Sequence, residues 1–374
     1  MDAHRRRAGG TTRRAFIGSL STLPLAANSQ KGQVYPADWR KYLDPATEFE
    51  ILRLTDPSYT SLLPAFYDRA IARRGNFLIY TSDRSGSKQA FRLDLKSGIA
   101  RQLTEASDID SASVTLVADE RTFCYVDGRR VVQSSLSGLR EREVYAVPED
   151  WTRGAGFSVS EDGLYCFLVE RQEKLHRLRM IPMARGAATT VVQAETPISD
   201  PMPRPKRAGL LYRRSEPQGP SSVWLVNYDG QQDRRLRIGG GAGPAQWSPD
   251  GRTVVYIGLP DENQKLSTIR ECTPDANTDQ VVSTTSQFVH FGRNSDASVF
   301  VGASGSKAAP YLLLLLRVAR RELTLCEHRS SDPMLVAPVF SPSSQRVFFQ
   351  SDRHGKPAIY TMAVERFVEE TSTE

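Results

Sequence analysis

The stretch Phe77–Thr104, FLIYTSDRSGSKQAFRLDLKSGIARQLT, decides the fold. The apolar run Phe77–Thr81, the alternating run Gln89–Leu95 and the edge-like run Ile99–Thr104 are separated by two glycine-containing turns. This pattern predicts three short antiparallel strands. Because so small a sheet cannot bury its apolar face alone, the stretch needs neighbours of the same kind.

The same plan of two strands joined by a polar turn recurs along the chain at the spacing of propeller blades. Including the first stretch, we count seven units, with no long segment of helical period between them. The six further units are Thr122–Tyr125 with Arg130–Ser135, Leu164–Val169 with His176–Pro182, Gly209–Tyr212 with Ser222–Tyr228, Thr253–Ile257 with Lys265–Arg270, Ser298–Gly302 with Tyr311–Arg317, and Arg346–Gln350 with Ala358–Val364.

The two ends of the chain suggest how the ring closes. The segment Phe49–Thr55 resembles the outer strand Ile99–Thr104, most clearly in its closing Leu-Thr, whereas the last unit ends near Glu365 without an outer strand. We therefore predict an all-β, seven-bladed β-propeller over residues 47–368, closed by an N-terminal strand that completes the last blade. Residues 30–46 form a lead-in, and residues 369–374 a disordered tail.

Residues 1–29 precede the predicted fold. The run Thr12–Ile17 places Arg13 and Arg14 before a mildly apolar stretch, which resembles a twin-arginine export signal and predicts a periplasmic or secreted protein. The alternative is a disordered basic tail. No later run approaches the ~18 apolar residues of a membrane span, so we expect no integral membrane protein.

The basic character of the chain belongs largely to this segment. The full chain carries a net charge of +6, and residues 1–29 contain five arginines and one aspartate, which leaves +2 for the rest. No basic block with interleaved aromatic residues follows, so we expect no nucleic-acid partner. The four cysteines fall in different units without zinc-ligand spacing, and we expect them to be buried and unpaired: Cys124, Cys166, Cys272 and Cys326.

Several motifs, in order from about residue 38 to 365, resemble the oligogalacturonate lyase family. The run Val144–Trp151 (VYAVPEDW) is the more specific of them, whereas Trp247–Gly251 (WSPDG) is common to many TolB-type propellers. The other segments are Asp38–Thr55, Tyr80–Thr104 and Val223–Gly230.

The resemblance implies a chemistry and a cofactor. Such enzymes cleave short unsaturated galacturonides by β-elimination, with a divalent metal, typically manganese, in the central funnel. The metal or fixed positive groups neutralise the uronate carboxylate, and a base takes the neighbouring proton. The implied substrate is an acidic oligosaccharide of pectin.

The family's metal and catalytic positions are mostly substituted here. His290 fits one metal-ligand position, but Leu335 and Ala337 stand where two histidines are expected, and a residue near Asp332 replaces a glutamine. Ser222 stands in place of an arginine. In the segment Gly243-Pro244-Ala245, Pro244 and Ala245 replace a His-Glu pair. The resemblance thus leaves both the manganese site and catalytic competence open, and no cofactor at all is an alternative.

The remaining site candidates are few. His290 is a candidate metal ligand or a structural histidine, and His328 a candidate substrate-binding residue or an ordinary loop residue. Arg84 and Arg353 occupy equivalent Ser-Asp-Arg turns, where they serve the turns or bind acidic sugars. A basic group near the fourth unit lines a cavity or, as we favour, is surface charge: Arg204, Lys206, Arg207, Arg213 and Arg214.

Two function hypotheses follow. The first is an exported lyase of pectin degradation with an altered site. The second is a non-catalytic TolB-like propeller that binds an acidic oligosaccharide or a protein partner.

Overall fold

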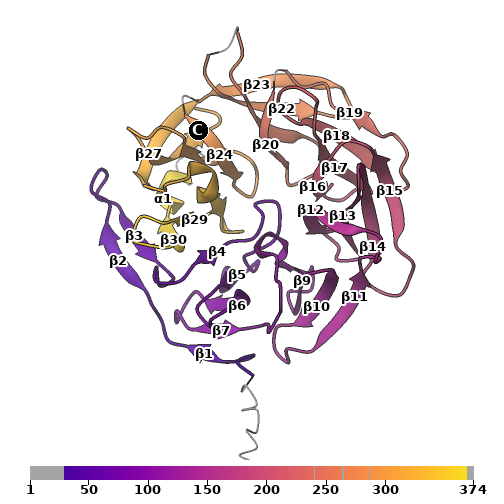
Figure 1. Ribbon diagram of the computed structural model, residues 1–374. Coiled ribbons are helices and arrows are strands. Elements are labelled where there is room, and N and C mark those ends of the chain that lie inside the picture. Colours follow the sequence, from indigo (N-terminus) through magenta and orange to yellow (C-terminus); the bar gives the residue numbers. More distant parts are fainter. Residues whose placement is uncertain (1–28, 240, 263–264, 286, 369–374) are drawn as a thin grey trace, which may run out of the picture.

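Seven antiparallel sheets form a ring around a central axis in the computed structural model, which describes residues 29–239, 241–262, 265–285 and 287–368 (Figure 1). In blades 2 to 6 the first strand lies nearest the axis and later strands follow outward, each hydrogen-bonded to its predecessor. The predicted seven-bladed propeller is confirmed.

Blades 2 to 6 each contain four strands. A short 3-10 turn, η1 (Ser111–Ser113), precedes blade 2. The strands are β8 (Thr115–Leu116), β9 (Thr122–Asp127), β10 (Arg130–Ser135) and β11 (Glu141–Ala146); β12 (Thr152–Val159), β13 (Tyr165–Gln172), β14 (Leu175–Pro182) and β15 (Thr189–Ala194); β16 (Ile198–Pro203), β17 (Gly209–Arg214), β18 (Ser222–Asn227) and β19 (Arg234–Arg235); β20 (Ala242–Trp247), β21 (Val254–Gly258), β22 (Thr268–Thr273) and β23 (Thr278–Thr284); β24 (Phe288–Arg293), β25 (Val299–Ser304), β26 (Tyr311–Leu316) and β27 (Arg321–Glu327).

Blades 1 and 7 each contain five strands because the N-terminal lead-in adds to both. The 3-10 turn η2 (Pro333–Val336) precedes blade 7, and a short helix, α1 (Glu365–Val368), follows it. Blade 1 consists of β4 (Ser61–Leu62), β5 (Phe77–Ser82), β6 (Gln89–Asp94), β7 (Ala100–Gln102) and β1 (Val34–Tyr35), and blade 7 of β28 (Val339–Phe340), β29 (Arg346–Ser351), β30 (Ala358–Ala363), β3 (Glu50–Arg53) and β2 (Arg40–Leu43).

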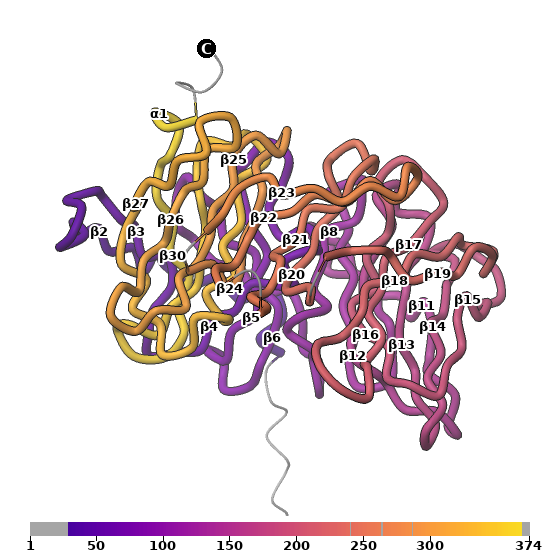
Figure 2. The backbone as a smooth tube through the Cα atoms, turned by 90° about the horizontal axis from the view of Figure 1, so that it is seen from above, coloured from indigo at the N-terminus to yellow at the C-terminus, as the bar shows by residue number. Residues whose placement is uncertain are grey.

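The ring closes as predicted, through β3. This strand pairs antiparallel with β30, with Leu52 opposite Thr361, and Ile51 is fully buried in the core of the last blade. Strand β2 lies outside β3, and Figures 1 and 2 both show the two strands beside the C-terminal blade. The lead-in strands β1 and β2 were not expected, because two to four residues carry little alternation.

The predicted turns have the chemistry that their residues dictate. Between β6 and β7, Asp94 Oδ1 accepts hydrogen bonds from the Ser97 N–H at 2.7 Å and from its hydroxyl at 2.8 Å. Gly98 follows at φ +75°, and a Cβ there would lie 2.7 Å from the Trp39 ring. Only glycine combines that conformation with so close an approach.

The apolar residues fill the spaces within and between blades. The leucines of β26, Leu312–Leu316, are buried, and the four cysteines are buried and free, as expected. No helix among the described residues is long and apolar enough to cross a membrane. The proposed export signal lies almost wholly in residues 1–28, and the C-terminal tail in 369–374, outside the described residues.

Candidate functional site

The inner strands of four successive blades lose their regular pairing at the same level. The register of β12 shifts between Arg153 and Phe157, and corresponding shifts occur in β16, β20 and β24. These irregularities lie near the starts of the inner strands. By antiparallel topology, the turns between second and third strands lie at the same end, which we call the second-turn face. Bulges re-aim side chains and are common beside functional sites.

The bulges of blades 3 and 4 fit tightly against each other. Gly156 has φ +108°, and a Cβ there would lie 2.5 Å from Pro201 Cδ and 2.8 Å from the backbone nitrogen of Asp200. Asp200 itself has a φ of 50°, in the left-handed region that aspartate tolerates better than most residues. The backbone therefore fixes where the Asp200 carboxylate lies.

In blade 1 the inner strand β4 is only two residues long and is followed by a longer excursion, residues 63–70, which we call the axial segment. It joins β4 to an isolated bridge between Ile71 and Leu78. The Phe66 ring lies edge-on to the His290 ring of blade 6, with centroids 4.9 Å apart. The Arg69 N–H donates to Thr115 Oγ1 of blade 2 at 3.1 Å. The axial segment thus links blades that are far apart in the ring.

Two ion pairs lie beside this segment, toward the second-turn face. Arg153 Nη1 lies 3.5 Å from Asp110 Oδ2, and Arg213 Nε lies 3.6 Å from Asp200 Oδ2. Arg213 also donates to the carbonyls of Ala242, at 3.1 Å, and Gly243. We call Asp110, Arg153, Asp200 and Arg213 the charged belt. The side chains of Arg153, Asp110 and Asp200 are 29%, 28% and 38% exposed, so solvent reaches them.

Burial perturbs one acid of the belt and two groups beside it. Desolvation raises the pKa of Asp200, although the nearby Arg213 guanidinium opposes this rise. Desolvation holds the pKa of Asp68 well above its ordinary value, and Asp68 Oδ2 is buried without a hydrogen-bond partner among the described residues. Burial and the Asp200 carboxylate likewise raise the pKa of Tyr67, so its phenol stays protonated. Clustered perturbed acids of this kind are typical of functional sites.

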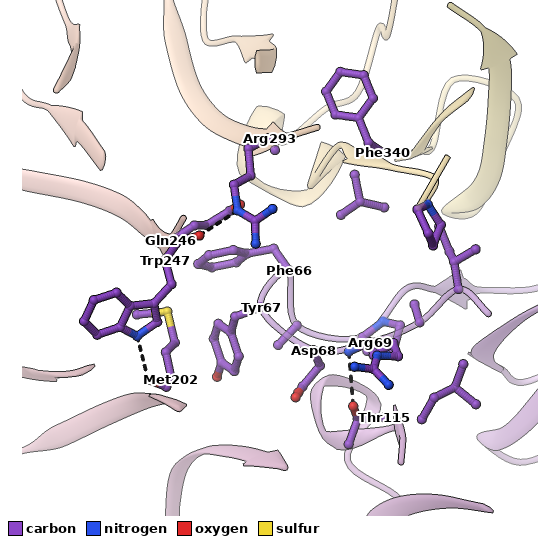
Figure 3. Close-up of a pocket in the computed structure, with 18 of the residues that line it drawn as sticks. Phe66, Tyr67, Asp68, Arg69, Thr115, Met202, Gln246, Trp247, Arg293 and Phe340 are labelled. Carbon is purple, nitrogen blue, oxygen red and sulfur yellow. Dashed lines mark hydrogen bonds between the residues drawn. The ribbon is translucent and has the colours of Figure 1, made fainter. Parts of the chain in front are cut away.

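A cavity of about 390 Å³ lies on the other side of the axial segment. It is bounded by the turns that join the first and second strands of the blades, which include Glu161, Ser295 and Pro342. These turns form the opposite face of the ring, and we call the cavity the first-turn pocket. Figure 3 shows Phe66, Trp247 and Arg293 on one side of it and Asp68 and Arg69 on the other.

The structure places His290 beside the axial segment. The side chain is 5% exposed, its Nδ1 has no hydrogen-bond partner among the residues described, and the ring it touches is Phe66. Burial lowers its pKa to about 4, so the imidazole is neutral near pH 7. A metal role for His290 stays a prediction.

His328 is fully buried with both ring nitrogens engaged. Nδ1 accepts from the Ser330 N–H at 3.0 Å, so Nε2 carries the proton and donates to the Ser304 carbonyl at 3.0 Å. Desolvation lowers its pKa. These contacts account for the residue structurally, and its substrate-binding role stays a prediction.

Arg84 and Arg353 hold the lead-in against the ring. Arg84 pairs with Asp38 at 2.9 Å and lies over the Tyr35 ring. Arg353 donates to the Glu327 carbonyl at 2.6 Å and lies over the ring of Tyr42. Both side chains are about nine-tenths buried, with exposures of 11% and 7%. Binding of acidic sugars by either one stays a prediction.

The described residues do not fit a tight manganese site. His290 has an aromatic neighbour, Leu335 and Ala337 offer no side-chain donor, and Asp332 Oδ1 caps η2 by accepting the Met334 N–H at 2.9 Å. No three His, Cys, Asp or Glu side chains gather as a metal site anywhere in the described ranges. Affinity for a transition metal depends on ligand number and geometry, and neither is provided.

Sequence reasoning did not identify the axial segment or the belt as a site. Of the basic group near blade 4, Arg213 belongs to the belt, whereas Arg204 forms a bidentate pair with Asp275 at 3.0 and 2.8 Å. The one available signal was the run Phe66-Tyr67-Asp68-Arg69. It places aromatic and charged residues next to each other at a position where the repeat predicts an alternating inner strand.

Comparisons with known proteins agree with this architecture. The sequence profile of a family described as oligogalacturonate lyase matches residues 29–170. An oligogalacturonide lyase of Pectobacterium atrosepticum is 24% identical over 383 aligned positions, covering 89% of this chain and 98% of the relative. An oligogalacturonate lyase of Dickeya dadantii is 22% identical, with the same coverage of both chains.

Solved structures show the same fold. The crystal structure of an oligogalacturonate lyase from Vibrio parahaemolyticus is 24% identical and superposes with a TM-score of 0.84, covering 89% of this chain and 98% of the other. An oligogalacturonate lyase in complex with manganese, also 24% identical, gives a TM-score of 0.85, covering 91% of this chain and 99% of the other. The chain is therefore similar in sequence to the oligogalacturonate lyases, as its motifs indicated, and has the propeller fold of these solved structures along nearly its whole length.

Proposed function

We propose that this protein acts on short galacturonides of pectin by β-elimination, and that the substrate binds at the charged belt. The observation that carries this proposal is the pair of bulges in β12 and β16, which place Arg153 and Asp200 beside the axis, with Arg213 of the neighbouring strand β17 paired to Asp200. Homology to lyases over nearly the whole chain supports the substrate class.

The reaction needs three groups. A base removes the proton from the carbon next to the uronate carboxylate, that electron pair forms a carbon-carbon double bond, and the bond to the glycosidic oxygen breaks. The departing oxygen then takes a proton. Positive groups stabilise charge that develops on the carboxylate, and a base works best when its pKa is near the operating pH.

The belt, together with Tyr67 of the axial segment, offers a group for each role. Arg153 and Arg213 neutralise the carboxylate. Asp200, whose pKa burial raises, takes the proton. The protonated Tyr67 phenol, in hydrogen-bond contact with Asp200, is the proton donor for the departing oxygen. Guanidinium groups acidify the carbon less than a bound metal does, so this assignment implies slow turnover without a tight metal requirement.

A non-catalytic sugar-binding propeller is the second candidate. The substitutions at Leu335 and Ala337 favour it, because they remove the donor side chains that the family resemblance implied. We also propose that the protein is exported, on the strength of the twin-arginine pattern Thr12–Ile17.

Belt variants test the proposal. Asp200→Asn and Arg213→Gln should each reduce the formation of unsaturated product from digalacturonate at least tenfold. Arg252→Gln removes an arginine that is 76% exposed on another part of the ring and should have no effect. If all three variants keep the turnover and the melting curve of the unmodified protein, the belt does not carry the reaction.

A further inference from the structure

The first-turn pocket contains two arginines without a carboxylate partner. Arg293, the last residue of β24, donates from Nε to the Trp247 carbonyl at 2.6 Å and from Nη1 to the Asn294 carbonyl at 3.2 Å. Arg69 Nη1 is buried and has no hydrogen-bond partner in the described chain. Within the described ranges, neither guanidinium lies in a salt bridge.

Another arginine beside the pocket does have a carboxylate partner. Arg204, which lies between two residues of the pocket wall, Pro203 and Pro205, is neutralised by both oxygens of Asp275. Burial lowers the pKa of Arg293 to about 10 and also lowers that of Arg69, yet both remain charged near pH 7. Removing a charge from water without a counter-ion is costly, so such groups usually have an anionic partner.

The acids around the pocket do not provide that partner. Glu161 is exposed at the rim and accepts the Lys206 N–H at 3.2 Å. Burial holds the pKa of Asp68 well above its ordinary value, so the neutral carboxyl group is favoured. In that form it can donate a hydrogen bond to a bound anion. An anion in the pocket would therefore meet two guanidiniums, with the exposed Glu161 carboxylate at the rim as the charged acid near both of them.

The walls indicate what else the ligand carries. Phe66, Trp247 and Met202 form an apolar side, and Gln246, Thr115 and Ser295 add neutral polar groups (Figure 3). A volume of about 390 Å³ equals that of about 13 water molecules, at ~30 Å³ each. Aromatic walls with few polar groups suit a ring that has one apolar face. A sugar acid combines such a ring with a carboxylate.

The geometry points to a second binding site in the first-turn pocket, where Arg69 and Arg293 hold the carboxylate of a small acidic sugar against Phe66 and Trp247. This site is separated from the charged belt by the axial segment. It does not depend on the proposed lyase activity, because the four side chains that would hold the sugar take no part in that reaction.

Calorimetric titration with D-galacturonate tests the inference. The unmodified protein should bind it saturably, and neutral D-galactose, which lacks the carboxylate, should not bind. Arg293→Gln and Arg69→Gln should each weaken binding at least tenfold, whereas Arg293→Lys, which keeps the charge, should weaken it less. Arg252→Gln, on the same face, should leave the affinity unchanged.

The site itself is located by fluorescence. Trp247 is one of four tryptophans, and its emission should change on galacturonate binding, a change that Trp247→Phe abolishes. The inference is wrong if galactose binds as well as galacturonate, if no saturable binding occurs, or if Arg213→Gln weakens binding and Arg293→Gln does not. The last result would assign the sugar to the belt and support the proposed lyase site instead.

Discussion

Replacing His290 with phenylalanine should make the protein markedly more resistant to acid. The imidazole is 5% exposed, touches the Phe66 ring and has an unpartnered Nδ1 among the described residues, so burial lowers its pKa from 6.5 to about 4. A phenyl ring of similar shape keeps the aromatic contact and cannot take a proton. The substitution therefore isolates the cost of keeping this histidine neutral.

The magnitude follows from linkage between protonation and folding. Above pH 6.5 the imidazole is neutral in both states and has no effect on stability. Below pH 6.5 the unfolded chain takes up the proton and the folded chain does not, so stability falls until the pH approaches 4. The loss amounts to about 1 kcal/mol at pH 6, about 2 at pH 5 and about 2.5 at pH 4.5.

Urea unfolding followed by circular dichroism at these pH values and at pH 7.5 measures the effect. The difference in unfolding free energy between His290→Phe and the unmodified protein should shift in favour of the variant by about 2.5 kcal/mol from pH 7.5 to pH 4.5. His176→Phe is a control, because His176 is partly exposed and should give a smaller shift. A pH-independent difference for His290→Phe would refute the burial argument.

Three other perturbations test closure, the metal and export. Ile51→Ala should lower the free energy of unfolding by about 2–5 kcal/mol, because Ile51 is fully buried on the closing strand, and deletion of residues 47–56 should cause aggregation by exposing the edge of β30; an unchanged melting curve and a monomeric deletion variant would contradict the closure. Titration with manganese should show no binding at micromolar concentrations, whereas tight binding that His290→Ala abolishes would restore a metal site. Arg13 and Arg14 replaced together by lysine should leave uncut precursor in the cytoplasm, and continued export would show that the signal is of another kind.

The blades could be predicted because their second and third strands alternate strictly and are joined by turns with specific residues. Thus Phe77–Thr81 and Gln89–Leu95 became β5 and β6 within a residue at each end. The innermost strands could not be predicted in the same way. Strands β4, β8 and β28 are two residues long, and four others contain bulges, so no period-2 signal extends along them.

The site was harder to predict for a related reason. Asp110, Arg153 and Asp200 come from three blades and are separated by tens of residues, so that only ring closure and the bulges bring them to one axis. The family resemblance directed attention to His290 and to the positions of Leu335 and Ala337. It gave no indication of Arg69 and Arg293. What distinguishes these two arginines is that they share a pocket and lack a carboxylate partner among the described residues, which only the three-dimensional structure shows.

The central claim is that the belt catalyses β-elimination in galacturonides without a tightly bound metal. The most direct measurement is the absorbance of unsaturated product formed from digalacturonate by the purified full chain, in chelator and again with added manganese. Slow product formation that is equal under both conditions and is lost in Arg213→Gln is the predicted result. No product under either condition, or product only with manganese, would contradict the claim.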